Sequence, residues 1–176
     1  MTQEDKELLL KYLCAILPYG VIVRHADYLV DSDGNYTGQF WYKRGYLYNI
    51  CRLDSMTTTI IESEGSDEEG YEHICDLERS LPYLRPMSSM TEEEILELYK
   101  ITYDTWYCDS LYYKNEEWIN FRDSIKNNNL CFKTCIWLSN INKVINWLLK
   151  NHFDFMGLIP KGLAIEVTKE NNPYKE

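Results

Sequence analysis

The stretch SNINKVINWLLKNHFDFMGLIPKGLAIEV, residues 139–167, predicts a helix, a turn and a short buried segment in close succession. Ser139 is a typical residue to cap the start of the helix. The aliphatic residues that follow recur at the spacing of a single helix face: Ile141, Val144, Ile145, Leu148 and Leu149. Gly157, Pro160 and Gly162 then break the helical pattern, and residues 163–167 form a short apolar run. The segment therefore indicates a packed core that buries one face of the last helix.

The N-terminal residues predict a second amphipathic helix. Thr2 is placed to cap it, and Glu4 and Asp5 fall in its first turn, where the helix dipole favours acids. Its apolar stripe is formed by Leu8, Leu9, Tyr12, Leu13 and Ile16. Pro18 and Gly20 end the pattern, so the helix is expected to stop just before them.

After this helix the pattern changes to short β-branched and aromatic runs. The run beginning at Val21 predicts a strand, and DSDGN at 31–35 is a dense turn signal between apolar flanks. Gly45 is expected at a turn before a further strand at 46–53, and residues 57–61 predict another. Together these runs predict a small antiparallel sheet with a hairpin at its start.

The second half of the chain predicts an additional helical lobe. Thr91-Glu-Glu-Glu94 forms a capping box, in which Thr91 and Glu94 can each satisfy a free amide of the first turn. Apolar residues around Trp118 indicate another short helix. We therefore expect a single α+β domain, residues 1–176, in which N- and C-terminal helices pack the sheet and a helical region occupies 91–127.

Charge and cysteine usage exclude several classes of protein. The net charge is −10, whereas a free-standing nucleic-acid binder normally carries a basic patch. The six cysteines are spread out and contain no C-x-x-C pair, whereas a disulfide scaffold would be smaller and denser in cysteine. The chain begins without a signal-peptide pattern and has no apolar run near the ~20 residues that span a bilayer. We expect a cytoplasmic protein with reduced thiols, no membrane association and no direct nucleic-acid binding.

Two metal patterns are present in part. Asp31-x-Asp33-x-Asn35 matches the opening of a calcium loop, but Tyr36 and Tyr42 occupy the positions that need Gly and Glu. His73, Cys75 and Asp76 are close in sequence, and a zinc site would draw further ligands from Cys131 and Cys135. Nothing in the sequence brings these two groups together, so we assign no metal ligand and no cofactor.

No catalytic residue is assigned either. A Cys–His hydrolase would have Cys75, Cys108 and His152 available, but none lies in a recognisable nucleophile setting. His152 directly follows the last predicted helix, where an imidazole interacts favourably with the helix C-terminus. We interpret His152 as a structural residue.

An acidic segment stands out between residues 54 and 78, which contain nine acids and no Lys or Arg. Its centre, at 62–72, is interpreted as an exposed acidic loop. The Tyr- and Trp-rich stretch after 106 supplies side chains that favour partner contacts. The candidate interaction surface combines the two: Glu64, Asp67, Glu68, Glu69, Tyr107, Tyr112, Tyr113 and Trp118.

Three segments carry a resemblance: KELLLKYLCAILPYGV at 6–21, LPYLRPMSSMTEEE at 81–94, and NWLLKNHFDFMGLIPKGLAIE at 146–166. They resemble a group of uncharacterised small proteins from gut anaerobes and their phages or integrated elements. The resemblance covers under half of the chain and implies a mobile-element context without a known activity.

We therefore interpret the chain as a non-enzymatic accessory or interaction protein whose partner is another protein. Two alternatives remain open at this point. One is a hydrolase-like enzyme with an unrecognised site. The other is an acidic inhibitor that mimics the charge of nucleic acid.

Overall fold

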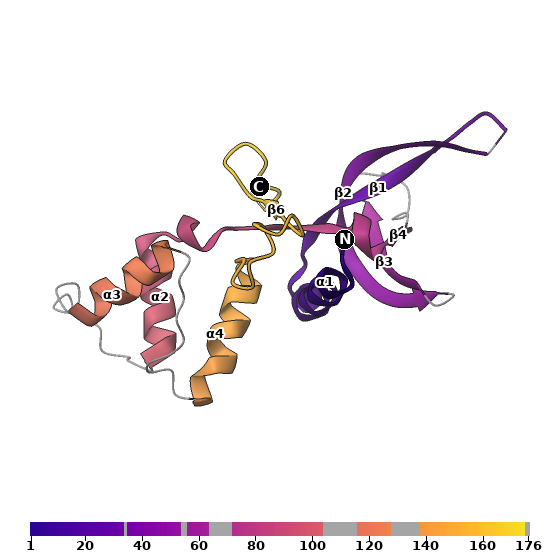
Figure 1. Ribbon diagram of the computed structural model, residues 1–176. Coiled ribbons are helices and arrows are strands. Elements are labelled where there is room, and N and C mark those ends of the chain that lie inside the picture. The colour runs from indigo at the N-terminus through magenta and orange to yellow at the C-terminus, as the bar shows by residue number, and fades with distance from the viewer. Residues whose placement is uncertain (34, 54–55, 64–71, 104–115, 128–137, 175–176) are drawn as a thin grey trace. The chain divides into compact units, whose positions relative to one another are not determined.

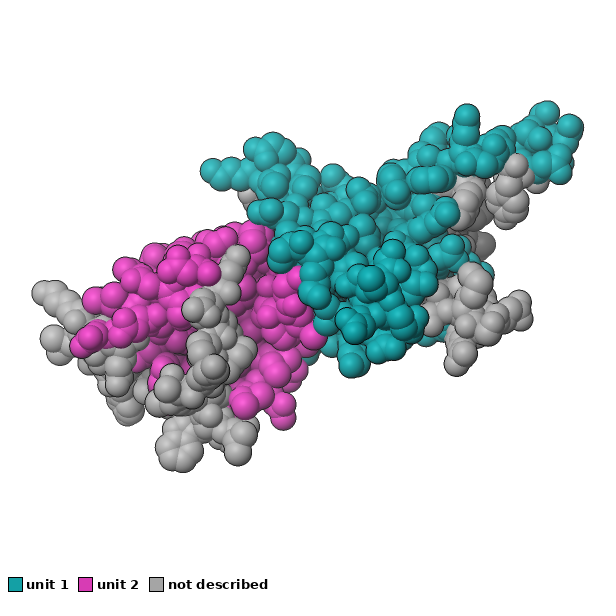
Figure 2. Space-filling view, viewed as in Figure 1, with its two compact units in different colours: residues 1–84, 158–176 teal, residues 85–157 magenta. Residues whose placement is uncertain are grey.

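The computed structural model describes residues 1–176 except positions 34, 54–55, 64–71, 104–115, 128–137 and 175–176. The chain forms two compact units, coloured separately in Figure 2. Unit 1 comprises residues 1–84 and 158–176, and unit 2 comprises residues 85–157. A sheet together with helices confirms the predicted α+β class (Figure 1). The single domain expected from the sequence corresponds here to two compact units.

The described residues of unit 1 form one α-helix and a six-stranded sheet of order β4-β3-β2-β1-β5-β6. Neighbouring strands pair antiparallel except β5 and β6, which pair parallel, so the sheet is mixed. The helix is α1 (Gln3–Ile16), followed by the 3₁₀ turn η1 (Leu17–Tyr19). The strands are β1 (Ile22–Val30), β2 (Tyr36–Leu53), β3 (Met56–Ser63), β4 (Glu72–Asp76), β5 (Leu81–Leu84) and β6 (Ile165–Glu166), with the 3₁₀ turn η2 (Leu77–Arg79) before β5.

The predicted hairpin is confirmed. The Asp31 carboxylate accepts hydrogen bonds from the backbone amides of Asp33 (3.0 Å) and Asn35 (2.8 Å), so it holds the turn between β1 and β2. The predicted turn at Gly45 was wrong, because β2 runs through it without a break. Gly45 is buried, and its pairing with both β1 and β3 keeps the strand continuous.

Helix α1 begins and packs as its sequence predicts. Thr2 and Asp5 form a reciprocal capping box at its start. The buried face is formed by Leu9, Tyr12, Leu13 and Ile16, each fully shielded from solvent. In Figure 1 this helix lies alongside the sheet, and Lys6 forms an ion pair with Glu78 of η2. Helix α1 is therefore an integral part of unit 1.

The sheet of unit 1 is strongly curved. Adjacent strands lie about 4.8 Å apart, so β1 and β4 would be about 14 Å apart in a flat sheet. The Nδ1 atom of His25 on β1 nevertheless lies 3.7 Å from the Sγ atom of Cys75 on β4. Turn η2 then leads from β4 into β5, which pairs with the other edge of β1. The five strands therefore curl toward a small barrel whose interior holds these two side chains.

The C-terminal residues complete unit 1. Val167 donates its amide to the carbonyl of Leu84 (2.8 Å) and is buried with Ile22 and Tyr83. The Tyr174 hydroxyl accepts from the amide of Ile22 (3.3 Å) and donates to the carbonyl of Tyr83 (2.9 Å). Burial raises the pKa of Tyr174, which keeps this hydroxyl protonated as a donor. The tail thus ties β1 to β5 from outside the sheet.

Unit 2 is helical and has its own core. It contains the 3₁₀ turn η3 (Met87–Ser89) and the helices α2 (Glu92–Tyr103), α3 (Glu116–Lys126) and α4 (Leu138–Lys150). The capping box predicted at Thr91 and Glu94 is confirmed by both of its hydrogen bonds. The buried face of α4 was expected to cover the sheet. Its Val144 and Leu148 instead belong to the core that α2 and α3 form in unit 2.

Helix α4 ends in a Schellman motif. His152 adopts a φ of 57° and donates its amide to the carbonyl of Leu149 (3.0 Å), while Phe153 donates to Leu148 (3.0 Å). The same turn is fastened to the start of the unit: Arg85 donates its amide to His152 and accepts from the amide of Asp154. The first residue of unit 2 is therefore joined by backbone hydrogen bonds to the turn that follows α4.

None of the helices in the described part of the chain has the length and apolar character needed to cross a membrane.

Candidate functional site

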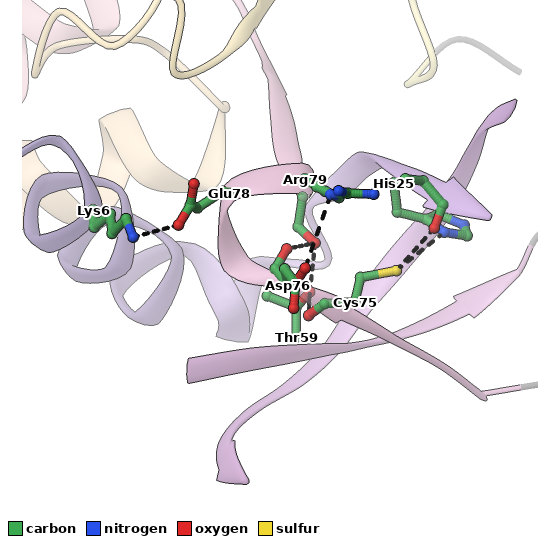
Figure 3. A network of polar contacts seen from close by, with 9 residues as sticks. Lys6, His25, Thr59, Cys75, Asp76, Glu78 and Arg79 are labelled. Atoms are coloured by element: carbon green, nitrogen blue, oxygen red, sulfur yellow. Dashed lines mark hydrogen bonds and ion pairs between the residues drawn. The ribbon is translucent and has the colours of Figure 1, made fainter. Parts of the chain in front are cut away.

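The curvature of the sheet brings together a cysteine and a histidine that the sequence kept apart. Cys75 is 4% exposed and His25 is fully buried. The Cys75 thiol lies 3.7 Å from His25 Nδ1 and donates to the carbonyl of Ala26 (3.3 Å). Figure 3 shows this pair facing each other between β1 and β4. Sequence reasoning weighed Cys75 with His152 and missed His25, because the pairing depends on how far the sheet curls.

A pair of hydroxyls lies beside the Cys75 backbone. Thr59 on β3 donates to the Cys75 carbonyl (3.2 Å) and shares a short hydrogen bond with Ser80. Ser80 is within hydrogen-bond distance (3.3 Å) of the carbonyl of Asp76. Both hydroxyl residues are fully buried, so their hydrogen bonds satisfy polar groups that would otherwise cost stability. This network fastens the start of η2 to the sheet, which is a structural role.

The Cys75–His25 pair is not arranged for nucleophilic chemistry. A nucleophile must be a thiolate and must be reached by substrate, whereas the Cys75 thiol donates its proton to a carbonyl and is buried. The neighbouring His25 side chain is also fully buried. The geometry therefore supports a packed, hydrogen-bonded thiol, and we assign no catalytic role to it.

Thiol labelling tests this assignment. Cys14 is exposed on α1, whereas Cys75 is buried, so Cys75 can react only when unit 1 opens. We expect Cys75 to be labelled by iodoacetamide roughly a hundredfold more slowly than Cys14, or slower still. Peptide mapping by mass spectrometry separates the two sites, and a Cys75→Ala variant identifies the slow one. Equal labelling rates would contradict the assignment.

The residues of the calcium-like pattern, Asp31, Asp33 and Asn35, are described, whereas the zinc pattern is described only in part. Asp31 is engaged in the hairpin turn through hydrogen bonds to backbone amides. Over the described ranges, no group of three or more His, Cys, Asp and Glu side chains is placed to hold a metal ion. Cys131, Cys135 and the side chain of His73 lie outside the residues that can be described.

The most prominent surface feature lies on β2. Five of its aromatic side chains are between 44% and 61% exposed, and we call them the β2 aromatic face: Phe40, Trp41, Tyr42, Tyr46 and Tyr48. Side chains alternate along a strand, so Phe40, Tyr42 and Tyr46 share one side and Trp41 lies on the other. The register shift between Leu47 and Asn49 interrupts this alternation at Tyr48. Leu47, on the opposite side, is buried. The strand therefore buries Leu47 and exposes aromatic side chains on both of its sides.

Cationic side chains lie over several of these rings. Arg24 of β1 stacks on Tyr42 with its guanidinium carbon 4.3 Å from the ring centroid. Lys43 lies 5.2 Å from the centroid of Trp41, and Arg79 of η2 lies 5.2 Å from that of Phe40. Phe40 and Tyr42 also meet edge to face at 5.4 Å. Each contact is favourable, because a cation is attracted to the face of an aromatic ring. The Trp41–Lys43 contact lies on the opposite side of the strand from Phe40 and Tyr42.

The interaction surface predicted from the sequence is located only at one of its positions. Seven of its residues lie outside the described part of the chain: Glu64, Asp67, Glu68, Glu69, Tyr107, Tyr112 and Tyr113. Trp118 is 2% exposed and packs edge to face on Tyr99 at 5.3 Å. Its assignment to a surface was wrong, because α3 is amphipathic and turns Trp118 into the core of unit 2.

Comparison with known proteins adds no relative to this description. The chain matches no protein-family model, and neither the curated proteins nor the solved structures contain a match.

Proposed function

We propose that this protein is a non-enzymatic accessory protein of a mobile element and that it acts by binding another protein through the β2 aromatic face. The exposure of five aromatic side chains on one strand carries the proposal. The mobile-element context rests on the resemblance of three sequence segments alone. Trp118 is not part of the proposed binding surface, because it is buried.

Burial of aromatic residues on binding is favourable for two reasons. Each Tyr or Trp side chain covers a large area while losing few rotatable bonds, and its polar group can still form a hydrogen bond. Tyr48 is 61% exposed and Tyr42 is 52% exposed, so most of their ring area is available to a partner. Several exposed aromatic side chains close together on one strand are uncommon on the surface of a protein without a binding partner.

A capture experiment tests the proposal. Tyr46→Thr/Tyr48→Thr replaces two exposed rings with β-branched residues, which are also favourable in strands. We expect this variant to lose at least about tenfold in affinity for a partner that the wild type captures from host extract, measured afterwards with the purified pair.

The matched control changes two exposed apolar residues of unit 2, Ile119 (37%) and Met156 (38%). Ile119→Ser/Met156→Ser should bind the partner as the wild type does. Circular dichroism and thermal melts of all three proteins establish that they are folded. Equal loss of binding in both variants, or none in either, would refute a role for the β2 aromatic face.

A further inference from the structure

Strand β5 lies between β1 and β6 and pairs with each of them over a different part of its length. Residues 81–82 pair antiparallel with residues 23–24 of β1, whereas residues 83–84 pair parallel with residues 165–166 of β6. The pairing of β1 with β5 thus ends at Pro82. We call the place where these two strands part the β1–β5 fork.

The hydroxyl of Tyr174 lies in this fork. In the register that pairs Val23 with Pro82, the next residues opposite each other are Ile22 and Tyr83. Here the Ile22 amide donates to the Tyr174 hydroxyl (3.3 Å), which in turn donates to the Tyr83 carbonyl (2.9 Å). The hydroxyl therefore connects two backbone groups that belong to opposite strands of the same ladder.

The sequence of β5 indicates that these two groups match each other. Hydrogen-bonded and non-hydrogen-bonded pairs alternate along an antiparallel ladder. Pro82 has no amide hydrogen, which fits a non-hydrogen-bonded pair with Val23. The next pair, Ile22 with Tyr83, is then of the hydrogen-bonded kind. The Tyr174 hydroxyl therefore occupies the place of one direct hydrogen bond between β1 and β5.

Residues 165–174, which we call the C-terminal strap, are fastened near both ends. Near one end, Val167 donates its amide to the carbonyl of Leu84 (2.8 Å). At the other end, the hydroxyl of Tyr174 lies in the fork. Residues 168–170 between these attachments are exposed. A segment with few buried groups opens at a lower free energy than the core of its unit.

The strap covers apolar side chains beside the β2 aromatic face. Ile22 (1% exposed) and Tyr83 (6%) are buried in a cluster with Val167, and Tyr174 packs against this cluster. Ile22 is the register partner of Tyr46, so their side chains lie on the same side of the sheet. Removal of the strap would therefore uncover Ile22 next to one of the exposed rings.

We propose that the C-terminal strap is a releasable lid with a closed and an open state. In the closed state, Tyr174 joins β1 to β5 through its hydroxyl and the strap covers Ile22. In the open state, the strap has left and the fork has closed, so that the Ile22 amide donates directly to the Tyr83 carbonyl. The inference goes beyond the proposed function and does not depend on it.

Closure of the fork is what makes the open state accessible. A backbone amide or carbonyl that loses its partner inside the protein destabilises the fold unless it finds another. The connection through the hydroxyl spans at most about 6 Å from the Ile22 nitrogen to the Tyr83 oxygen, so a shift of about 3 Å gives a direct hydrogen bond. The two residues are already opposite each other, so the register does not change.

Hydrogen exchange of single amides, followed by NMR on the full-length protein, tests whether the strap opens by itself. The reference is Leu13, which is fully buried in α1. In the wild type, the protection factor of the Val167 amide should be at least about tenfold lower than that of the Leu13 amide. This difference is expected because release of the strap leaves the rest of unit 1 folded.

Tyr174→Phe tests closure of the fork, because it removes the hydroxyl that joins the two strands. The protection factor of the Val167 amide should fall by about tenfold or more. The Ile22 amide should keep its protection within about threefold, since the Tyr83 carbonyl becomes its acceptor. A scalar coupling through the hydrogen bond, between the Ile22 nitrogen and the Tyr83 carbonyl carbon, should appear in this variant.

A matched control and a second variant complete the test. Tyr48→Phe removes the hydroxyl of a ring that is 61% exposed, and it should change the protection of Ile22 and Val167 by less than about twofold. Val167→Ser weakens the other attachment of the strap and leaves the Tyr174 hydroxyl in the chain. It should also lower the protection of the amide at position 167 and produce the coupling between Ile22 and Tyr83.

Three results would overturn the inference. Equal protection of Val167 and Leu13 in the wild type would show that the strap opens only when unit 1 unfolds. Unchanged protection of Val167 in Tyr174→Phe would show that the hydroxyl does not hold the strap. A parallel loss of protection at Ile22 and Val167 in that variant, without the coupling, would show that the fork does not close.

Discussion

Leu148→Ala is expected to lower the free energy of unfolding by about 2–5 kcal/mol. Leu148 is fully buried in the core of unit 2, where it lies among side chains of α2 and α3. Removing three carbon atoms loses their burial from water and leaves a cavity that the packed helices fill only in part. The backbone carbonyl of Leu148 also accepts the amide of Phe153, so a shift of this turn would weaken the Schellman motif.

Chemical denaturation and hydrogen exchange of the α2 and α4 amides measure this effect. Asn146→Ala provides the control, because Asn146 is exposed on the same helix and Ala has the higher helix propensity. This control should change stability by less than about 1 kcal/mol. A melting curve that Leu148→Ala leaves unchanged would show that the buried face of α4 contributes nothing to the fold.

Unit 2 is expected to lose about 2 kcal/mol of stability as the pH falls from about 6.5 to 4. Burial, together with the nearby positive charge of Arg85, lowers the pKa of His152 from its ordinary value of 6.5 to about 4. In the unfolded chain the imidazole takes up a proton near pH 6.5, whereas in the folded chain it stays neutral until about pH 4. The unfolded state therefore binds more protons in this window, and the folded state becomes less stable as the pH falls. The full difference corresponds to at most about 3 kcal/mol, and partial exposure reduces it.

His152→Asn isolates this contribution. Asn tolerates the φ of 57° at this position better than most residues do, and it does not titrate. Arg85 also pairs with Glu94 through two hydrogen bonds of 2.7 and 2.9 Å. Although burial raises the pKa of Glu94, the hydrogen bonds from Arg85 and the Thr91 amide lower it below its ordinary value of 4.5.

The Glu94 contribution has the same sign but is lost only below about pH 4.5, and it remains in both proteins. Stability should be compared by urea denaturation at pH 7.5, which lies above the window where His152 titrates, and at pH 6, 5 and about 4.5, which lie within it. The wild type should lose stability relative to His152→Asn across this series. Parallel curves for the two proteins would contradict a buried neutral imidazole.

Local sequence signals predicted the helices and the hairpin well. Thr2 and Thr91 are capping residues, and the structure shows the predicted hydrogen bonds at both. The Asp31 turn was predicted for the same reason, since an Asx side chain bonds amides only a few residues away. Each of these features depends on atoms close together in the chain. Periodicity and capping chemistry were therefore sufficient.

Signals that depend on a second element were misread. Gly45 resembles a turn residue, but pairing on both sides keeps it inside an unbroken strand. This error divided β2 and hid the aromatic face, since Phe40, Tyr42 and Tyr46 then no longer belonged to one alternating pattern. Their alternate spacing on a strand without acids was the signal that could have revealed it. The opposite error was made at Trp118, where a buried residue was assigned to the surface. The reason is that an aromatic residue in a polar stretch resembles a surface residue.

The amino-acid order alone determined that helices begin after Thr2 and Thr91 and that a turn follows Asp31, because caps and turns are set by neighbours a few residues away. Only the tertiary structure decided which faces are buried and which residues meet. The curl of a sheet is the sum of twist over several strand pairs, and no local pattern encodes it. That curl brings Cys75 to within 3.7 Å of His25 inside unit 1. The pairing of β2 with its neighbours turns Leu47 inward and the rings of Tyr46 and Tyr48 to solvent.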